Sequence, residues 1–286
     1  MTEHAGPPPS LNLNVRGMQP SATVAINEHS NALIAAGRTV YKLGLGQSPF
    51  PVPPSVVEAL RQHAHRKEYL PVRGLPELRA AVAEFHRRRA GLGDAYQAED
   101  VLVAPGSKEL MFIVQLAFYG DLLLPSPSWV SYSPQARIIG RQVNFLPTSI
   151  ADRWMLRPDT LDAHCRRDRG RPRVLILNYP SNPTGQTFSR DELAALAAVA
   201  RQHQLIVISD EIYGELDHAG THGSIAEFYP EGTILSAGLS KWCGAGGWRL
   251  GTFLFPAQLR WLRDAMTAVA SEKIGRASCR ERVSSP

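Results

Sequence analysis

Lys241 is followed by a glycine-rich segment and, eight residues later, by Arg249. The lysine comes shortly after the apolar run 233–235, which predicts a buried strand. A lysine amine condenses with an aldehyde, and an arginine guanidinium binds phosphate through two hydrogen bonds. The pair therefore predicts imine chemistry on a phosphorylated aldehyde, with Lys241 bonded to the aldehyde and Arg249 holding the phosphate.

Asp210 ends the apolar run 205–209, which predicts a second buried strand. A carboxylate in such a place needs a partner. A protonated pyridine nitrogen is one, because the carboxylate keeps the ring protonated and the ring then accepts electrons from a substrate carbanion. Tyr213 is expected near the same ring. The structural alternative for Asp210 is a helix N-cap.

A third polar group, Gly106-Ser107-Lys108, follows the apolar run Val101–Ala104 and opens a predicted helix over 108–118. Free backbone N–H groups and the helix dipole favour a phosphate there, although a plain strand-to-helix turn has the same appearance. Lys108 is a rival for the imine-forming lysine. We assign that role to Lys241, because Lys108 lies at a helix start without an arginine at matching spacing.

Two further loops follow predicted strands. Trp129 comes after a Pro-Ser-Pro-Ser turn and could stack on a flat heteroaromatic ring or simply fill the core. The segment 178–185, Asn-Tyr-Pro-Ser-Asn-Pro-Thr-Gly, contains two prolines and a terminal glycine, which predict a rigid loop that aims the amide of Asn182.

Apolar runs alternate with helical segments along most of the chain, at 101–104, 122–124, 143–146, 174–177, 205–208 and 233–235. Runs that are apolar on both faces predict a mainly parallel α/β sheet covered by helices on both sides. A capping box, Ser189 to Glu192, begins the helix between the fourth and fifth runs. In such sheets the chemistry gathers at the carboxyl ends of the strands, where the polar groups above are found.

The composition excludes several classes of protein. No run of 18 apolar residues occurs, so we expect no membrane span, and the N-terminus lacks the pattern of a secretory signal. Residues 273–286 contribute +3 of the net charge of +5, and the clusters 87–89 and 166–173 are interpreted as a solvated helix end and loop, so no nucleic-acid partner is expected. Three scattered cysteines predict a reducing, cytoplasmic location.

Taken in their order along the chain, from Gly106-Ser107-Lys108 to Lys241 and Arg249, these motifs resemble those of the pyridoxal 5′-phosphate (PLP) aminotransferases of classes I and II. The resemblance extends from about Val40 to Leu262. The resemblance implies PLP as the cofactor and the large domain of PLP fold type I, a mainly parallel seven-stranded sheet with helices on both faces. It implies an N-terminal leader and arm over 1–45 and a PLP-binding domain over 46–272. It also implies a homodimer with shared active sites.

The resemblance assigns a role to each matching residue. Asn182 and Tyr213 reach the ring oxygen, Trp129 stacks, and Tyr69 binds the phosphate in the neighbouring subunit's site. Gly46 lies against the substrate carboxylate, where Asn182 also contacts the substrate. The cofactor-binding set is Tyr69, Gly106, Ser107, Lys108, Trp129, Asn182, Asp210, Tyr213, Ser240, Lys241 and Arg249.

The chain departs from the family pattern in two places. Many members carry a serine three residues before the lysine, where this chain has Gly238. The arginine that binds the substrate α-carboxylate belongs to a C-terminal small domain, and we expect most of that domain to be missing here. Residues 273–286 resemble a translated sequencing adapter and are expected to be a non-native or disordered tail.

The function expected from this resemblance is PLP-dependent transfer of an amino group between an α-amino acid and a 2-oxo acid. A PLP-dependent lyase or decarboxylase on the same scaffold stays open, because cofactor residues do not set the reaction type. So does an inactive fragment of an aminotransferase. A ligand-sensing domain of a regulator is disfavoured, since no DNA-binding segment precedes Val40.

Overall fold

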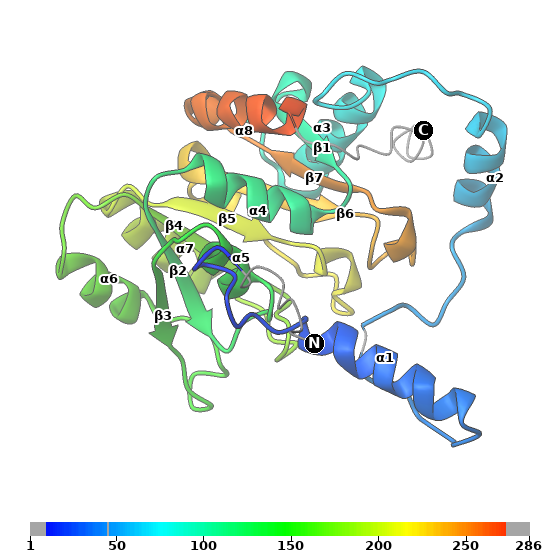
Figure 1. Cartoon of the computed structure of the whole chain (residues 1–286). Coiled ribbons are helices and arrows are strands. Elements are labelled where there is room, and N and C mark those ends of the chain that lie inside the picture. The colour runs from blue at the N-terminus through cyan, green and yellow to red at the C-terminus, as the bar shows by residue number, and fades with distance from the viewer. Residues whose placement is uncertain (1–9, 45, 273–286) are drawn as a thin grey trace.

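A seven-stranded mixed sheet forms the centre of the molecule, in the order β1-β7-β6-β5-β4-β2-β3 (Figure 1). The computed structural model describes residues 10–44 and 46–272. Neighbouring strands from β3 to β6 pair in parallel, which confirms the predicted mainly parallel sheet. The strands are β1 (Val101–Ala104), β2 (Asp121–Ser126), β3 (Val143–Pro147), β4 (Arg173–Asn178), β5 (Ile206–Asp210), β6 (Thr233–Gly238) and β7 (Gly251–Leu254).

Helices cover both faces of this sheet. The predicted capping box is present, because Ser189 Oγ accepts a hydrogen bond from the Glu192 amide and Glu192 accepts one from the Ser189 amide. The α-helices are α1 (Ala22–Ala35), α2 (Pro54–His63), α3 (Pro76–Ala90), α4 (Ser107–Ala117), α5 (Tyr132–Ile138), α6 (Pro158–Arg166), α7 (Arg190–Gln202) and α8 (Arg260–Glu272).

Alternating residues of the central strands pack in hydrophobic cores on opposite faces of the sheet. In β4, Val174 and Ile176 pack in the core beneath α4 and α8, whereas Leu175 and Leu177 pack in the core beneath α6 and α7. Each such side chain is buried, which stabilises the fold by about 1.5–3 kcal/mol relative to an exposed one. Because both faces are covered, the strands carry continuous apolar runs, and their ends are the places left for polar groups.

Strand β7 was not predicted from the sequence, and it completes the functional edge of the sheet. It pairs antiparallel with both β1 and β6, so its first residue, Gly251, lies beside Ala104 and Gly238. Two antiparallel pairings leave β1 running in the same direction as β6. The carboxyl ends of β1, β2, β4, β5 and β6 therefore meet the start of β7 at one edge.

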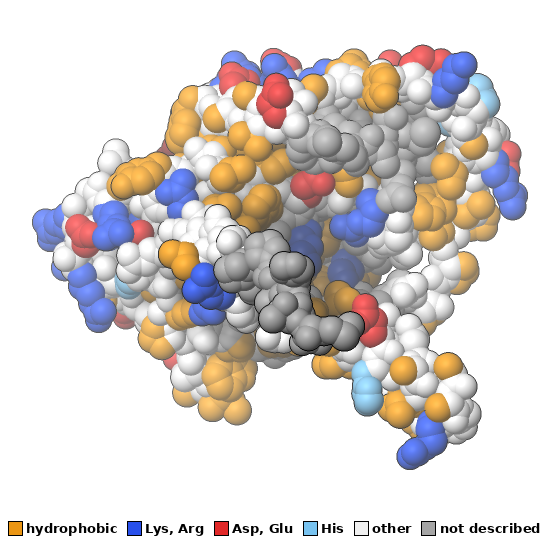
Figure 2. All heavy atoms as spheres, in the orientation of Figure 1, with side chains coloured by type: hydrophobic (Ala, Val, Ile, Leu, Met, Phe, Trp, Pro, Cys, Tyr) orange, Lys and Arg blue, Asp and Glu red, His pale blue; other side chains and the backbone are white. Residues whose placement is uncertain are grey.

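The segments before α3 lie apart from the sheet. Helices α1 and α2 contain no buried residue, and α1 projects away from the body (Figure 1). Apolar side chains of α1, including Val24, Ile26 and Ile34, are exposed. Figure 2 shows Lys and Arg side chains inside a hollow between α1 and the body. None of the helices in the described ranges is both long and apolar enough to cross a bilayer. The expectations for residues 1–9 and 273–286 lie outside the described residues.

Candidate functional site

Lys241 lies in the turn after β6 and contacts two distant segments. Its ammonium donates a hydrogen bond of 2.6 Å to the carbonyl oxygen of Gly46. The same ammonium lies 5.4 Å from the centre of the Tyr213 ring. The fold therefore brings together Gly46, Tyr213 and Lys241, the three residues that the sequence placed near the reacting atoms of a substrate.

Arg249 lies against the start of α4. It adopts a left-handed backbone conformation, with φ of 58°, and its guanidinium donates hydrogen bonds to the carbonyl oxygens of Gly246 at 2.8 Å and Pro105 at 3.3 Å. Gly106, which precedes α4, has a φ of 97°. A Cβ there would lie 2.1 Å from Arg249 Nη2, so only glycine allows this approach. The guanidinium and the amino end of α4 thus form one positively polarised corner.

Gly251 and Gly238 make the same corner compact. A Cβ at Gly251 would lie 1.9 Å from the Ser107 amide nitrogen, because the start of β7 passes directly beside α4. A Cβ at Gly238 would lie 2.5 Å from the carbonyl oxygen of Leu250. The serine that many family members carry at the position of Gly238 therefore has no room in this backbone, which explains the departure from the pattern.

Asp210 ends β5 and is buried, with 4% of its surface exposed. Its carboxylate accepts hydrogen bonds from the Tyr132 hydroxyl at 2.5 Å and from Ser236 Oγ at 3.1 Å. Burial raises the pKa of Asp210, the two hydroxyls oppose that rise, and the resulting value is about 6. Within residues 10–44 and 46–272, no lysine, arginine or histidine forms an ion pair with this carboxylate.

The loop after β4 carries Asn182 to the same edge. Its side-chain nitrogen lies 3.4 Å from the Tyr213 hydroxyl, and its backbone amide donates to the side-chain oxygen of Asn178 at 2.7 Å. Asn178 in turn donates to the backbone carbonyl of Asp210 at 2.9 Å. These bonds tie the ends of β4 and β5 together, so the Asn182 amide and the Asp210 carboxylate belong to one connected group.

Trp129 and Lys108 contact each other at the edge of this group. The Lys108 ammonium lies 5.6 Å from the centre of the Trp129 ring, and that ring packs edge-on against Tyr132 at 5.1 Å. Lys108 therefore contacts an aromatic face, whereas Lys241 lies beside Tyr213. The contact of Tyr132 with this group was not predicted from the sequence, because no local pattern distinguishes it from other residues at the start of a helix.

Two of the residues expected to bind the cofactor, Tyr69 and Ser240, form no side-chain hydrogen bond with another expected site residue in the described part of the chain. Tyr69 is 98% exposed, so nothing in the described part of its own chain covers the ring. Ser240 precedes Lys241 in the turn after β6, and its hydroxyl has no hydrogen-bond partner in the part of the chain that the structure describes. Exposure of Tyr69 is compatible with its expected role in a second subunit.

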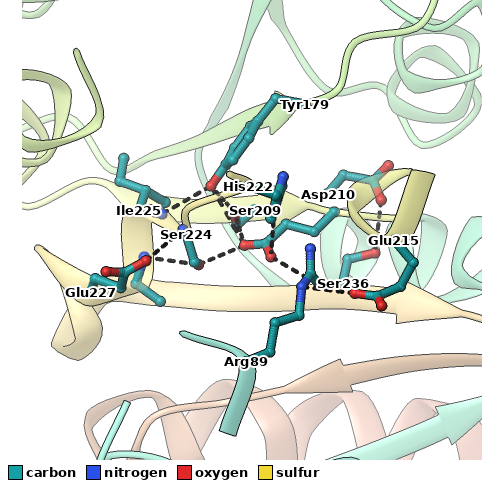
Figure 3. A network of polar contacts seen from close by, with 12 residues as sticks. Arg89, Tyr179, Ser209, Asp210, Glu215, His222, Ser224, Ile225, Glu227 and Ser236 are labelled. Carbon is teal, nitrogen blue, oxygen red and sulfur yellow. Dashed lines mark hydrogen bonds and ion pairs between the residues drawn. The ribbon is translucent and has the colours of Figure 1, made fainter. Parts of the chain in front are cut away.

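Glu211, the neighbour of Asp210 in the chain, is the centre of a buried polar network whose members Arg89, Ser209, His222 and Ser224 are labelled in Figure 3. Glu211 accepts hydrogen bonds from Ser209 at 2.7 Å, Ser224 at 2.6 Å and His222 at 3.1 Å, and Arg89 lies 3.6 Å away. Burial raises the pKa of Glu211, but these donors and charges outweigh it and lower the value to about 2. Glu211 is therefore ionised at neutral pH under the end of β5, with Arg89 as its cationic partner.

The interpretation of the arginine clusters as solvated was wrong at two positions. The Arg89 side chain is only 15% exposed, because it pairs with Glu211 and with Glu215 at 2.8 Å. Arg173 begins β4 and is 4% exposed, since its guanidinium donates to the backbone carbonyls of residues 168 and 171. A basic run at a helix end is solvated only where no carboxylate or carbonyl lies opposite it.

Comparison with known proteins supplies relatives for both the sequence and the fold. An aspartate aminotransferase of Geobacillus stearothermophilus is 34% identical over 267 residues, covering 90% of this chain and 66% of the relative. A bifunctional aspartate aminotransferase and glutamate/aspartate-prephenate aminotransferase of Petunia hybrida is 36% identical, and the match covers 86% of this chain and 52% of the relative. The structure of an aspartate aminotransferase from Thermus thermophilus with maleate has a TM-score of 0.88 at 32% identity. The superposition covers 96% of this chain and 72% of that one.

The chain thus spans about half to two thirds of the length of these curated relatives. The sequence model of aminotransferases of class I and II matches residues 38–281, which is most of the chain and includes every strand of the sheet. Enzymes of this family depend on pyridoxal phosphate. From the sequence match together with the shared fold, the chain belongs to the class I and II aminotransferase family.

Proposed function

We propose that the complete protein transfers an amino group between an α-amino acid and a 2-oxo acid, with PLP held at the edge described above. The observation that carries the proposal is the buried carboxylate of Asp210. It has no cation as partner within the described residues, and it ends the strand next to the one that leads to Lys241. A protonated ring nitrogen satisfies such a carboxylate.

The residues present suit both ends of the PLP molecule, its phosphate and its ring. The corner formed by Arg249, Gly106 and the amino end of α4 suits a phosphate, because it combines a guanidinium with free helix N–H groups. Asn182 and Tyr213 provide an amide and a phenol on the side of Lys241, where they suit the ring oxygen. Trp129 supplies an aromatic face for stacking.

When bound, PLP supplies an aldehyde that condenses with amines and a ring that withdraws electrons from the substrate α-carbon. Lys241 Nζ would hold the cofactor through its aldehyde, and the same amine, when free, would move the proton of the substrate α-carbon. The charge of Asp210 keeps the ring nitrogen protonated. The hydrogen bond from Lys241 to the Gly46 carbonyl places the amine beside the segment proposed to contact the substrate carboxylate.

The partner and substrate assignments belong to the same proposal. A homodimer accounts for the exposure of Tyr69, which would bind the phosphate across the interface. The names of the relatives favour aspartate as the first amino donor to test. Cys165 and Cys243 are free thiols, which supports a reducing compartment such as the cytoplasm.

The decisive experiment is covalent trapping of PLP on the full chain. Protein incubated with PLP is reduced with borohydride and digested, and the labelled peptide is identified by mass spectrometry. We expect the label on Lys241, loss of both label and visible absorption in Lys241→Ala, and, at saturating PLP, retention of the label on Lys241 in Lys108→Ala. Label on Lys108 instead would overturn the assignment.

The reaction type needs a second measurement on the protein with its full family-length sequence. Single-turnover mixing with aspartate should convert bound PLP to its aminated form and release the corresponding 2-oxo acid. If no amino acid produces the aminated cofactor while PLP still binds Lys241, the transaminase assignment is wrong and a lyase or decarboxylase is favoured.

A further inference from the structure

Both carboxylate oxygens of Asp210 are occupied by hydroxyl groups from elements far away in the sequence. Oδ2 accepts from Tyr132, the first residue of α5, and Oδ1 accepts from Ser236 of β6. Tyr132 and Ser236 are 1% and 0% exposed, so water does not compete for either bond. Tyr132 is held in turn by the edge of the Trp129 ring.

From this geometry we infer that Tyr132 and Ser236 are positioning residues that keep Asp210 ionised, so that the proton shared with the cofactor ring stays on the ring. The inference rests on the proposed function for the identity of that ring. It adds two residues to the site whose effect is on where a proton resides, rather than on contact with PLP.

The direction of the effect follows from which groups can donate. Burial, and then the charge of Asp210, raise the pKa of Tyr132 well above its usual value, so the phenol keeps its proton and acts as a donor. Ser236 also donates here. Hydrogen bonds donated to a carboxylate favour the charged form, because the charged oxygen is the stronger acceptor.

The other charged groups around Asp210 act against these donors. Glu211 is its neighbour in the chain, and its permanent negative charge raises the pKa of Asp210, as burial also does. The Ile212 amide is a further donor to the carboxylate. Lys241 Nζ donates a hydrogen bond to the Gly46 carbonyl rather than to Asp210. Without the two hydroxyls, burial and Glu211 would leave Asp210 protonated at neutral pH.

A carboxylic acid in place of the carboxylate would change the ring. A protonated Asp210 can only donate to an unprotonated nitrogen, and an unprotonated ring withdraws electrons less strongly. Tyr132 and Ser236 thus decide between a charged pair and a neutral pair. The phenol is the stronger of the two donors by geometry, since its bond is 2.5 Å against 3.1 Å for Ser236.

The test is a titration of Asp210 in the cofactor-free full chain by ¹³C NMR of labelled aspartate, with the signal assigned from Asp210→Asn. We expect a midpoint of about 6 in the wild type. In Tyr132→Phe it should move up by about one to two pH units, the equivalent of one hydrogen bond to a charged group. Ser236→Ala should give a smaller upward shift and serves as the second variant if Tyr132→Phe does not fold.

The matched control is Tyr229→Phe, which removes a buried hydroxyl that donates to the carbonyl oxygen of Leu205 rather than to Asp210. Its midpoint should equal that of the wild type. A wild-type midpoint in both Tyr132→Phe and Ser236→Ala overturns the inference.

A second readout uses PLP itself. The Kd measured by fluorescence at pH 7 should be about two- to tenfold weaker in Tyr132→Phe, following the ionised fraction of Asp210, and should approach the wild-type value at higher pH. A pH-independent loss would indicate a merely structural role and contradict the inference. Absence of PLP binding in the wild type would overturn the proposed function but leave the titration result standing.

Discussion

The guanidinium of Arg249 occupies the space that a side chain at Gly106 would need. A Cβ at Gly106 would lie 2.1 Å from Nη2 and 2.8 Å from the guanidinium carbon. The arginine comes from the segment before β7, and the glycine lies between β1 and α4, so their contact ties the start of β7 to the helix that follows β1. The positively polarised corner formed by Arg249 and the amino end of α4 depends on this close approach.

Gly106→Ala should therefore weaken PLP binding by at least about tenfold, a loss of about 1.4 kcal/mol. The new methyl group must displace Arg249, and φ of 97° is itself unfavourable for alanine. Fluorescence titration of PLP measures the effect. Gly220→Ala is the control, since its φ is 65° and nothing lies within 4 Å of the added Cβ. Equal Kd values for the two variants would refute the steric explanation.

The buried imidazole of His86 should make the protein less stable in mild acid. Burial lowers the pKa of His86 to about 4, below its usual 6.5, so the unfolded chain takes up the proton first. The free energy of unfolding should thus be highest above pH 6.5 and fall towards pH 4, by up to about 3 kcal/mol. Urea unfolding of His86→Gln should show a smaller fall. His65→Gln, at an exposed position, should behave like the wild type.

The Asp100 carboxylate fixes α8 to the start of β1. It is fully buried and accepts two hydrogen bonds from Arg260, at 2.7 and 2.8 Å, and another from the buried Arg263. Asp100→Asn leaves both guanidinium groups without this charge and should lower the free energy of unfolding by about 3 kcal/mol. Asp168→Asn removes an exposed partner of Arg171 and should change it by less than about 1 kcal/mol. Chemical denaturation compares the two.

Arg89 should matter far more for stability than its neighbour Arg88. Arg89→Met removes the cation beside the buried Glu211 and should destabilise the fold by about 2 kcal/mol. This is less than the roughly 3–5 kcal/mol expected for a fully buried pair, because the second partner, Glu215, is partly exposed. Arg88 is 76% exposed, and among the residues that the structure describes its one ion pair is with Glu84 on the helix surface. Arg88→Met should therefore have an effect within about 0.5 kcal/mol. Similar melting temperatures for the two variants would show that the Glu211 network tolerates the loss of Arg89.

The sheet could be predicted from the sequence because its parallel strands are apolar on both faces and end in polar groups. Lys241, Asp210 and Asn182 were proposed as site residues for a related reason, because each is a polar residue at the end of such a run or a few residues beyond it. Strand β7 was missed, since it is four residues long, begins with glycine and follows a glycine-rich turn. Periodicity alone does not distinguish so short a segment from a loop.

The supporting residues of the site could not be predicted in this way. Tyr132 donates to a carboxylate 78 positions away, and Arg89 faces Glu211 from another layer of the molecule. Such contacts depend on how the helices are laid on the sheet, and no local pattern encodes them. Most residues proposed to touch PLP follow strands, whereas Tyr132 and Arg89, which support them, come from helices α5 and α3.

The position of β7 in the sheet also determines when β1 can pair during synthesis of the chain. Among the described strands, β1 pairs only with β7, which is made long after it. Until residue 254 has been added, β1 has no partner strand and the edge of β6 that pairs with β7 is open, so both can pair with other chains. The insertion of β7 between β1 and β6 also places Arg249 beside α4, so the seven-stranded sheet and the positively polarised corner are completed together.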